Sequence, residues 1–540
     1  MNDVIGFVKA KGCKLVNGEG REILLRGVGL GGWMLPEGYM WRMPEQADRP
    51  RRIEKMIVEL LGEKKAEVFW DQYFECYTSE ADIRRIAEEG FNSVRVPINS
   101  RLILKAGEPY SFKEYRLNLI DRVIDWCRKY NLYVILDLHG APGGQTGANI
   151  DDSEHDRPEL FTDEQYKRIT IELWRMLAER YRDEWIVAGY DLLNEPLPDW
   201  FSSYNSQVMP LYKEITNEIR KVDKQHMIIL EGVHWATDWT IFNEKFDDNL
   251  MLQFHKYWNN PDTESIRAFL DKREEWNVPI YMGEGGENNK YWYTGAFQLY
   301  EDHGISWNFW TWKKMNTNNS PCSVNIPEGW KNLADYAQGG VKPDKETAEG
   351  ILWKYLENIY FDHCTYHAEV VDSILRRIPV RIPAVFYGFR GEGASFGISG
   401  KAEENIGFRV NDGVSIRFMK GSKAVLNFKH TAGEEWQPEE WLFAHLKAGD
   451  WTAYEFAVPP AGDVLGFFVK LYLNTAGGSG RLAISLDGGY LETVAVKGDS
   501  WGVARMNEKI RLCPGQHRLI LKAEEGPVGV AWLEIGRYED

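Results

Sequence analysis

Short apolar runs alternate with long amphipathic stretches through the first two thirds of the chain. Apolar residues recur at the helical period of three to four positions in Phe112–Tyr130, Glu164–Arg182, Met209–Val222, Thr263–Trp276 and Asn289–His303. Around and between these stretches lie eight apolar runs typical of buried strands: Ile23–Leu30, Phe91–Pro97, Leu132–His139, Ile186–Pro196, His226–Gly232, Leu250–Tyr257, Pro279–Gly285 and Ile305–Trp312. Eight strands that alternate with helices predict a (β/α)₈ barrel. A doubly wound open sheet is the alternative, but no GxGxxG or GxxxxGK(S/T) follows an early strand.

The pattern changes after a basic linker, Arg376–Pro383. Short runs with turn residues between them follow: Ile406–Val410, Ser415–Met419, Ala424–Lys429, Thr452–Val458, Val464–Asn474, Arg481–Ser485, Leu491–Val496, Arg518–Ala523 and Val528–Ile535. They predict a C-terminal antiparallel β-sandwich of the jelly-roll type. We therefore expect a barrel over residues 1–375, opened by a hairpin at Asn17-Gly18, and a sandwich over residues 376–540.

Composition narrows the class of partner. The 540 residues exceed one ordinary core, and the net charge is −17. Nucleic-acid binding needs clustered cations, so we expect no nucleic-acid partner and a neutral substrate instead. No run of about 18 apolar residues occurs, which predicts no membrane span.

The N-terminus and the cysteines bear on location. The first residues have no basic region followed by a long apolar one, and the six cysteines are scattered without CxxC spacing. This combination predicts reduced thiols in a cytoplasmic protein. A secreted chain whose leader has been removed is the alternative.

Polar residues stand at the carboxyl ends of the predicted barrel strands, where a barrel of this type builds its active site. Two-residue alternation places Trp310 and Trp312 on the same face of the last strand. The residues that we expect to converge at this end are Arg95, His139, Asn194, Glu195, His255, Tyr257, Glu284 and Trp310. Arg95 has a structural alternative, which is to pair with a buried acid such as Asp137.

Two of these residues are glutamates at the ends of separate strands. Glu195 lies in Asn194-Glu195-Pro196, and Glu284 lies in Gly283-Glu284-Gly285. Retaining glycosidases need two carboxyl groups on a rigid scaffold, one to protonate the leaving oxygen and one to attack the sugar carbon. The pair therefore predicts a glycoside hydrolase.

The motifs resemble glycoside hydrolase family 5 over roughly residues 7–365. The matching residues are Arg95, His139, Asn194-Glu195-Pro196, His255-x-Tyr257, Glu284 and the tryptophan of strand eight. The segment Leu138–Gly147, together with Phe309–Lys313, is similar to the exo-β-1,3-glucanase branch, whereas Ala148–Ser153 departs from it. The resemblance implies a retaining mechanism on a β-linked glycan.

The chemistry and the resemblance agree on the expected roles. Glu195 is the general acid and base, and Glu284 is the nucleophile. Arg95 and Tyr257 favour the nucleophile's carboxylate, and Asn194 holds the sugar 2-hydroxyl. The remaining assignments are that His139 and His255 bond sugar hydroxyls or orient Glu195, and that Trp310 forms the floor under the reacting ring, with Trp312 as second choice.

Three loops add weaker candidates. Trp33, Met34, Glu37, Tyr39 and Trp41 follow strand one and either line the cleft or pack the loop. Asp151, Asp152 and His155 stand in an insertion after strand three, where a polar loop could close the cleft and bind the terminal sugar. His234, Trp235 and Asp238 follow strand five.

The sequence offers no recognisable metal or cofactor motif. Strand one has no HxH, and the chain has no HExxH, so we expect neither a metal-dependent hydrolase nor a cofactor. The function predicted is an exo-acting β-glycosidase on gluco- or manno-oligosaccharides. A secreted endo-β-1,4-glucanase or β-mannanase acting on polysaccharide is the alternative, and a non-catalytic glycan-binding protein is the alternative of another class.

The C-terminal segment resembles jelly-roll carbohydrate-binding modules such as those of family 6. The resemblance rests on Tyr454–Pro459, Ile484–Gly488 and Pro514–Leu519. Such a domain either binds glycan or packs on the barrel, and a chain with no evident secretion signal favours packing.

Overall fold

The computed structural model describes residues 3–400, 406–420, 425–459, 466–475, 478–498, 500–506 and 510–537. Its chain forms two compact units. One contains the residues up to Lys256 together with Phe269–Gly286 and Ile305–Tyr366; the other contains Tyr257–Ala268, Glu287–Gly304 and the residues from His367 onward.

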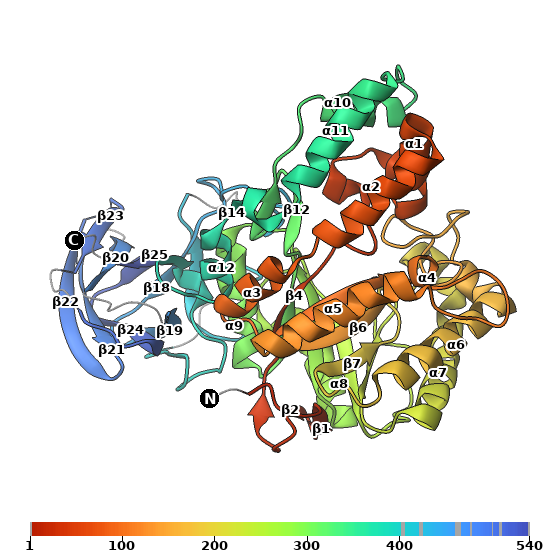
Figure 1. The fold of residues 1–540 in the computed structure, drawn as a ribbon. Coiled ribbons are helices and arrows are strands. Elements are labelled where there is room, and N and C mark those ends of the chain that lie inside the picture. Colours follow the sequence, from red (N-terminus) through yellow and green to blue (C-terminus); the bar gives the residue numbers. More distant parts are fainter. Residues whose placement is uncertain are drawn as a thin grey trace. The chain divides into compact units, whose positions relative to one another are not determined.

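The first unit contains a closed barrel of eight parallel strands in the order β10-β11-β4-β5-β6-β7-β8-β9 (Figure 1). Apolar residues dominate these strands and are buried on both faces, which is the pattern of a parallel sheet covered by helices. The strands are β4 (Arg26–Gly29), β5 (Ser93–Asn99), β6 (Tyr133–Gly140), β7 (Val187–Asp191), β8 (Met227–Glu231), β9 (Leu250–His255), β10 (Ile280–Gly286) and β11 (Ser306–Trp310). The predicted barrel and all eight of its strands are confirmed.

Helices connect the strands, and local capping defines several of their ends. The Asp163 carboxylate accepts from the Gln165 amide at the start of α6, and Asn131 ends α5 in the left-handed conformation. The connecting helices are α3 (Glu80–Glu88), α4 (Ser100–Ile103), α5 (Glu114–Tyr130), η3 (Glu159–Phe161), α6 (Glu164–Tyr181), η4 (Asp199–Gln207), α7 (Val208–Val222), η5 (Thr263–Ile266), α8 (Arg267–Trp276) and α9 (Lys290–Asp302). The five helices expected from the apolar period are all present.

Two small sheets accompany the barrel. The predicted hairpin is present, because β2 (Lys14–Val16) pairs with β3 (Glu22–Ile23) across the turn at Asn17. On its other side, β2 pairs with β1 (Lys9–Lys11). The other small sheet follows the last barrel strand and consists of β12 (Lys313–Met315), β13 (Cys322–Val324) and β14 (Thr365–Tyr366).

Long insertions follow the first and the last barrel strand and pack together. Trp41, in the first insertion, contacts the rings of Trp70, Trp330 and Tyr355, and its carbonyl accepts from the Trp330 indole at 2.8 Å. Their helices, which stand together in Figure 1, are η1 (Gly38–Trp41), η2 (Glu45–Ala47), α1 (Pro50–Leu61), α2 (Glu63–Cys76), α10 (Trp330–Ala337), α11 (Lys345–Asn358) and η6 (Phe361–His363). We call this cluster the insertion wall.

The second unit contains two antiparallel sheets, which confirms the predicted β-sandwich. One sheet has the order β17-β18-β25-β20-β23 with β15 also paired to β25, and the other has the order β16-β19-β24-β21-β22. The elements are α12 (Ala368–Ile374), β15 (Val380–Pro383), η7 (Ala384–Phe386), β16 (Phe396–Gly397), β17 (Ser415–Phe418), β18 (Leu442–Leu446), β19 (Trp451–Val458), β20 (Phe467–Asn474), β21 (Ser479–Leu486), β22 (Gly489–Lys497), β23 (Gly502–Arg505), β24 (Gly515–Glu525) and β25 (Val528–Arg537).

Two predicted sandwich strands are wrong. Residues 406–410 form a loop, because Arg409 has φ +50° and its guanidinium donates to the carbonyls of Val385, Tyr387 and Gly388. In the other segment, 424 lies outside the described residues, and 425–429 is irregular because the Asn427 side chain accepts from the Lys429 amide. Side-chain bonds of this kind compete with a strand ladder for the backbone.

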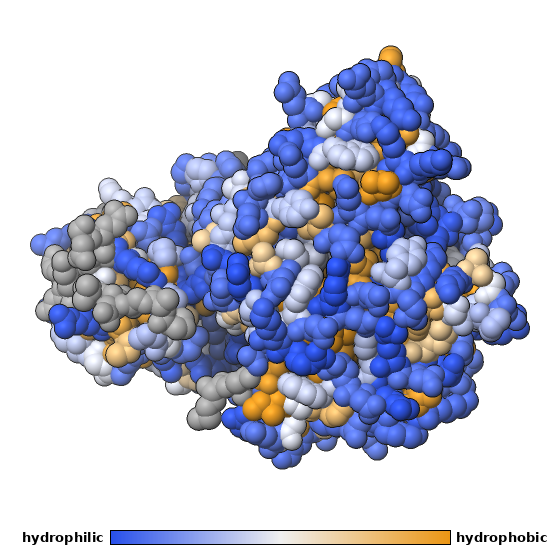
Figure 2. Space-filling model, viewed as in Figure 1, coloured by the Kyte–Doolittle hydropathy of each residue, from blue (hydrophilic) through white to orange (hydrophobic). Residues whose placement is uncertain are grey.

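The face of the barrel unit seen in Figure 2 is mainly hydrophilic, with hydrophobic patches between its helices. Within the described ranges, no helix combines the length and the apolar character that a bilayer crossing requires.

Candidate active site

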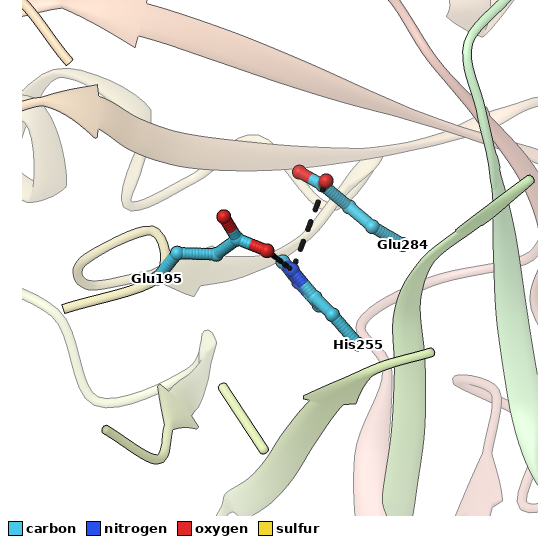
Figure 3. Close-up of side chains that lie close together, drawn as sticks. All are labelled: Glu195, His255 and Glu284. Carbon is cyan, nitrogen blue, oxygen red and sulfur yellow. Dashed lines mark hydrogen bonds and ion pairs between the residues drawn. The ribbon is translucent and has the colours of Figure 1, made fainter. Parts of the chain in front are cut away.

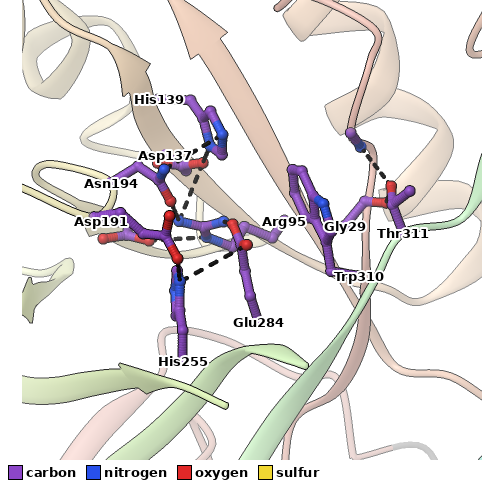
Figure 4. Close-up of polar contacts among 12 residues, drawn as sticks. Gly29, Arg95, Asp137, His139, Asp191, Asn194, His255, Glu284, Trp310 and Thr311 are labelled. Atoms are coloured by element: carbon purple, nitrogen blue, oxygen red, sulfur yellow. Dashed lines mark hydrogen bonds and ion pairs between the residues drawn. The ribbon is translucent and has the colours of Figure 1, made fainter. Parts of the chain in front are cut away.

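Arg95 lies at the centre of the polar cluster at the carboxyl end of the barrel (Figure 4). It is fully buried on β5, and its guanidinium makes ion pairs or hydrogen bonds with residues from four other strands or their ends: Asp137 at 3.2 Å, Asp191 at 2.9 Å, Asn194 at 2.8 Å, Glu231 at 3.0 Å and Glu284 at 2.5 Å. Burial alone would lower the pKa of Arg95, but the surrounding carboxylates raise it well above its ordinary value. Arg95 therefore anchors both predicted catalytic strands, and the expected pairing with Asp137 is present as well.

Glu195 and Glu284 both point toward His255 (Figure 3). His255 Nδ1 is 2.7 Å from Glu195 Oε1 and 3.7 Å from Glu284 Oε2. The nearest side-chain oxygens of the two glutamates and the His255 nitrogen all lie within 4.8 Å of one another. The barrel thus brings together two carboxyl groups that stand 89 positions apart in the chain.

The backbone at Glu195 is in a rarely populated conformation. Its φ is +44°, in the left-handed region, which costs a non-glycine residue about 1–3 kcal/mol. The Glu195 amide donates to Glu231 Oε2 at 2.7 Å, and a hydrogen bond to a charged group contributes about 1.5–3 kcal/mol. This bond offsets the backbone cost and fixes the direction of the Glu195 side chain.

The cluster holds five carboxyl groups against two cations, so their protonation differs from group to group. Burial raises the pKa of Glu195, and the negative charges of Glu284 and Glu231 raise it further. The hydrogen bond from His255 lowers it but does not cancel these effects. Burial also raises the pKa of Asp191 well above its ordinary value. For Glu231, burial acts in the same direction, but His255 and Arg95 outweigh it and lower the pKa.

Trp310, the predicted floor residue, presents its ring beside His139. The two rings are parallel, with centroids 5.3 Å apart, and the Trp310 indole donates to the Tyr39 hydroxyl at 3.1 Å. A Cβ atom at Gly29 or Gly31 would lie 2.5–2.7 Å from the Trp310 ring. Only glycine at these positions lets the indole lie this close to the backbone.

His139 and Asn194 complete the wall next to this ring. His139 Nδ1 is 2.7 Å from Asp137 Oδ2, and its Nε2 is 3.3 Å from the Asn194 amide nitrogen and 4.0 Å from Glu37 Oε1. These contacts fix the orientation of the imidazole, because each ring nitrogen faces a defined partner.

Three candidates have contacts that hold the scaffold instead. The Trp33 indole donates to the Phe74 carbonyl, and both carboxylate oxygens of Asp151 accept from its own loop between Thr146 and Ser153. The expectation that Trp312 shares a face with Trp310 is wrong. Strand β11 ends at Trp310, so the alternation stops there and the Trp312 indole bonds Asp82 on α3.

Tyr257 belongs to the second compact unit, although only one residue separates it from His255. It is half-buried, and its carbonyl accepts from the Asn288 side chain at 3.0 Å. Its predicted contact with the nucleophile stays a prediction.

The sequence reasoning did not select Glu231, Asp191 or Gln253. All three are fully buried and bond within the cluster; Glu231 and Asp191 both bond Arg95, and Gln253 donates to Asp191 at 3.0 Å. Their signal was available, because each is a polar residue at or near the end of an apolar run. Applying the strand-end criterion to strand five would have found Glu231.

The two glutamates and His255 could in principle ligate a divalent cation, since their ligand atoms lie close together. Imidazole binds metal through a lone pair, which requires a deprotonated nitrogen. Burial alone would lower the pKa of His255, but Glu231 and Glu284 raise it well above its ordinary value, which favours the protonated imidazole over a metal ligand. This donor set does not fit a metal.

Comparisons with known proteins point to one enzyme family. Residues 58–316 match the profile of the cellulase family, glycosyl hydrolase family 5. A Phanerodontia chrysosporium protein named beta-xylosidase is 28% identical over 347 residues, which are 58% of this chain and 71% of that protein. Endoglucanase C of Acetivibrio thermocellus is 25% identical over 312 residues, 46% of this chain and 88% of its own. The probable glucan 1,3-beta-glucosidase A of Neosartorya fischeri is 30% identical over 241 residues, 43% of this chain and 56% of that protein.

The relatives share a reaction class but differ in the glycan that their names state. Their common chemistry, hydrolysis of an O-glycosyl bond, agrees with the closed eight-stranded barrel and with the family match. Residues 58–316 therefore form a glycoside hydrolase family 5 domain.

Proposed function

We propose that the barrel hydrolyses β-linked gluco- or manno-oligosaccharides with retention of configuration, by double displacement. The observation that carries this proposal is the approach of the Glu195 and Glu284 oxygens to within 4.8 Å. Retaining glycosidases hold their carboxyl groups about 5–5.5 Å apart, whereas inverting enzymes leave about 6.5–9.5 Å for a water. The short separation supports direct attack by a carboxylate.

The roles follow from the contacts of each group. Arg95 Nη1 donates to Glu284 at 2.5 Å, which is a charge-assisted hydrogen bond to the carboxylate of the proposed nucleophile. Burial raises the pKa of Glu195, which favours the protonated form that a general acid requires. Glu284 attacks the anomeric carbon while Glu195 protonates the leaving oxygen; Glu195 then takes a proton from water, which hydrolyses the glycosyl-enzyme.

The sugar that is attacked would lie against Trp310. Its ring offers an apolar face to a pyranose, and its indole hydrogen is bonded to Tyr39. His139 and Asn194 face the same space, and their polar atoms are within 3.3 Å of each other. This proximity supports the proposal that both residues bond hydroxyls of the sugar that is attacked.

The position of the insertion wall supports an exo mode of action. Strands β11 and β7 are four places apart in the ring of eight, so Trp310 and Glu195 face each other across the barrel. The leaving group lies on the side of the general acid, so the glycone lies on the side of β11 and its neighbour β4. The insertions that follow these two strands build the wall, which would stop a longer glycan from extending beyond the glycone.

The opposite side carries exposed aromatic rings. Trp200 is 63% exposed, and its ring meets that of Trp235 at 5.6 Å. The two residues lie in the loops that follow Glu195 and Glu231, and the His234 amide ties these loops together through the Leu197 carbonyl at 2.7 Å. We propose that these rings support the sugars of the leaving group.

Product analysis tests the proposal. Cello-, laminari- and manno-oligosaccharides of three to six sugars, labelled at the reducing end, are incubated with the enzyme and with Glu195→Gln and Glu284→Ala. We expect stepwise release of a monosaccharide from the unlabelled end, and proton NMR should detect it first as the β anomer. Neither variant should release product. The α anomer appearing first would refute retention. Internal cleavage would refute the exo mode and favour an endoglucanase, and binding without turnover would make the chain a glycan-binding protein.

A further inference from the structure

Glu231 is a third carboxylate in direct contact with the catalytic residues. It ends β8, is fully buried and uses both of its oxygens. Oε2 accepts from the Glu195 amide at 2.7 Å; Oε1 accepts from Arg95 Nη2 at 3.0 Å and lies 3.4 Å from His255 Nε2. The Glu231 side chain therefore contacts the backbone amide of Glu195 and also the imidazole of His255, which bonds the Glu195 carboxyl group.

The surroundings of His255 leave Glu231 as the acceptor for its Nε2 hydrogen. The Gln253 amide nitrogen also lies 3.0 Å from His255 Nε2. That nitrogen has two hydrogens, and Asp191 Oδ2 and Glu231 Oε1 accept both. It has none left for the imidazole, so His255 Nε2 keeps its own hydrogen and directs it toward Glu231.

The other ring nitrogen, His255 Nδ1, faces the general acid. It lies 2.7 Å from Glu195 Oε1. Resting on the proposed role of Glu195 as the acid, we propose that Glu231 is a positioning residue: it keeps His255 protonated on both nitrogens, so that Nδ1–H donates to Oε1 and the transferable proton stays on Oε2 of Glu195.

The electrostatics of the cluster agree with this arrangement. Burial opposes a charge on His255, but Glu231 and Glu284 raise the pKa of the imidazole well above its ordinary value. The charged or titratable groups that contact His255 or its partners come from four other strands or their ends: Arg95, Asp191, Glu195, Glu231 and Glu284. The same logic operates in Ser-His-Asp triads, where a buried carboxylate fixes the tautomer of the histidine.

Removal of the Glu231 charge would misplace the proton. A neutral His255 can accept at Nδ1, so the Glu195 proton would move to Oε1 and be held in the bond to the imidazole. In the wild type, the proton leaves Oε2 for the glycosidic oxygen as that bond breaks, and water returns a proton to Oε2 in the second step. Glu231 itself neither gains nor loses a proton in this cycle.

The test compares leaving groups in the full-length enzyme. Glu231→Gln keeps the volume and one acceptor oxygen but removes the charge. Aryl β-glucosides, or β-mannosides if these are the ones turned over, are assayed with 2,4-dinitrophenol and with phenol as leaving groups. Dinitrophenolate leaves without protonation, whereas phenol must be protonated as it leaves. We therefore expect kcat/KM of Glu231→Gln to fall by about 10²-fold for the phenyl glycoside and by less than about 3-fold for the dinitrophenyl glycoside. Glu231→Asp, which keeps the charge, should restore part of the loss.

The control is another buried carboxylate–histidine pair, at the amino end of the same strand. Asp223 Oδ2 lies 2.5 Å from His226 Nδ1, and both side chains are fully buried. We expect Asp223→Asn to lower the stability of the fold and to leave the ratio of kcat/KM for the two glycosides unchanged. If Glu231→Gln slows both substrates equally, as a purely structural residue would, the positioning role is refuted. If Glu195→Ala itself shows no dependence on the leaving group, the proposed function fails instead.

Discussion

Replacing Asp223 by asparagine should destabilise the barrel at neutral pH and leave catalysis unchanged. Asp223 ends α7, at the amino end of β8 and away from the catalytic end of the barrel. Four donors surround its carboxylate: the Tyr190 hydroxyl at 2.8 Å, the amides of Gln225 and His226 at 2.7 and 3.1 Å, and His226 Nδ1 at 2.5 Å. Asparagine fills the same space but presents an NH₂ group to some of these donors.

The magnitude follows from the pKa of Asp223. Burial alone would raise it, but the donors, led by His226, lower it from 3.8 to about 2. At about 1.36 kcal/mol per pH unit, the ionised carboxylate contributes about 2 kcal/mol to the free energy of unfolding. Because the pKa in the folded state is the lower one, this contribution is fully present above pH 3.8 and is lost as the pH falls toward 2.

Equilibrium urea unfolding, followed by near-UV circular dichroism at pH 6 and pH 3, measures this contribution. The free energy of unfolding of the wild type should exceed that of Asp223→Asn by about 2 kcal/mol at pH 6 and by clearly less at pH 3. Asp183→Asn, at a side chain that is 91% exposed, is the matched control and should shift stability by less than about 0.5 kcal/mol. Equal stability at pH 6, or a difference that does not shrink in acid, would refute the reasoning.

Further predictions concern the catalytic end. Glu195→Ala should lower kcat on phenyl glycosides by about 10²–10⁴-fold, and azide should restore turnover of dinitrophenyl glycosides with formation of a β-glycosyl azide; no rescue would argue against Glu195 as the acid and base. Wild-type kcat/KM should fall as the pH rises through the raised pKa of Glu195, because the acid then loses its proton, and this limb should vanish in Glu195→Gln assayed on dinitrophenyl glycosides. Trp310→Ala should lower kcat/KM by about 5- to 30-fold, which corresponds to about 1–2 kcal/mol of lost stacking, and an unchanged value would show that the ring does not contact the sugar. Glu284→Ala should abolish turnover with the urea midpoint unchanged, and residual wild-type activity would exclude it as the nucleophile.

The barrel and much of its site could be predicted because the relevant signals are local in the sequence. A buried parallel strand needs an apolar run, and its carboxyl end is marked by the first polar residues, as at Asn194-Glu195 and Glu284. The order of strands then places these ends together whatever the loops do. Arg95, His139 and His255 could be assigned in the same way, without knowledge of any contact between them.

Several loops and outer strands differ from the predictions because contacts that the local sequence pattern does not show determine their structure. Asp151 looked like a cleft residue, but its carboxylate accepts amide hydrogens from its own loop. Trp312 seemed equivalent to Trp310 until the end of β11 removed the alternation that linked them. Arg409 interrupts a run of apparent strand residues because its guanidinium binds three carbonyls of a distant segment.

The sequence by itself determined the class of fold, the pair of candidate catalytic carboxyl groups and the family that the barrel resembles, since each depends on residue type and spacing along the chain. The tertiary structure alone decided the state of the site. It buries five carboxyl groups around Arg95 and His255, raises the pKa of Glu195 and lowers that of Glu231, and joins two insertions into a wall. These properties arise from distances between residues that are far apart in the chain, and burial strengthens every charge interaction among them.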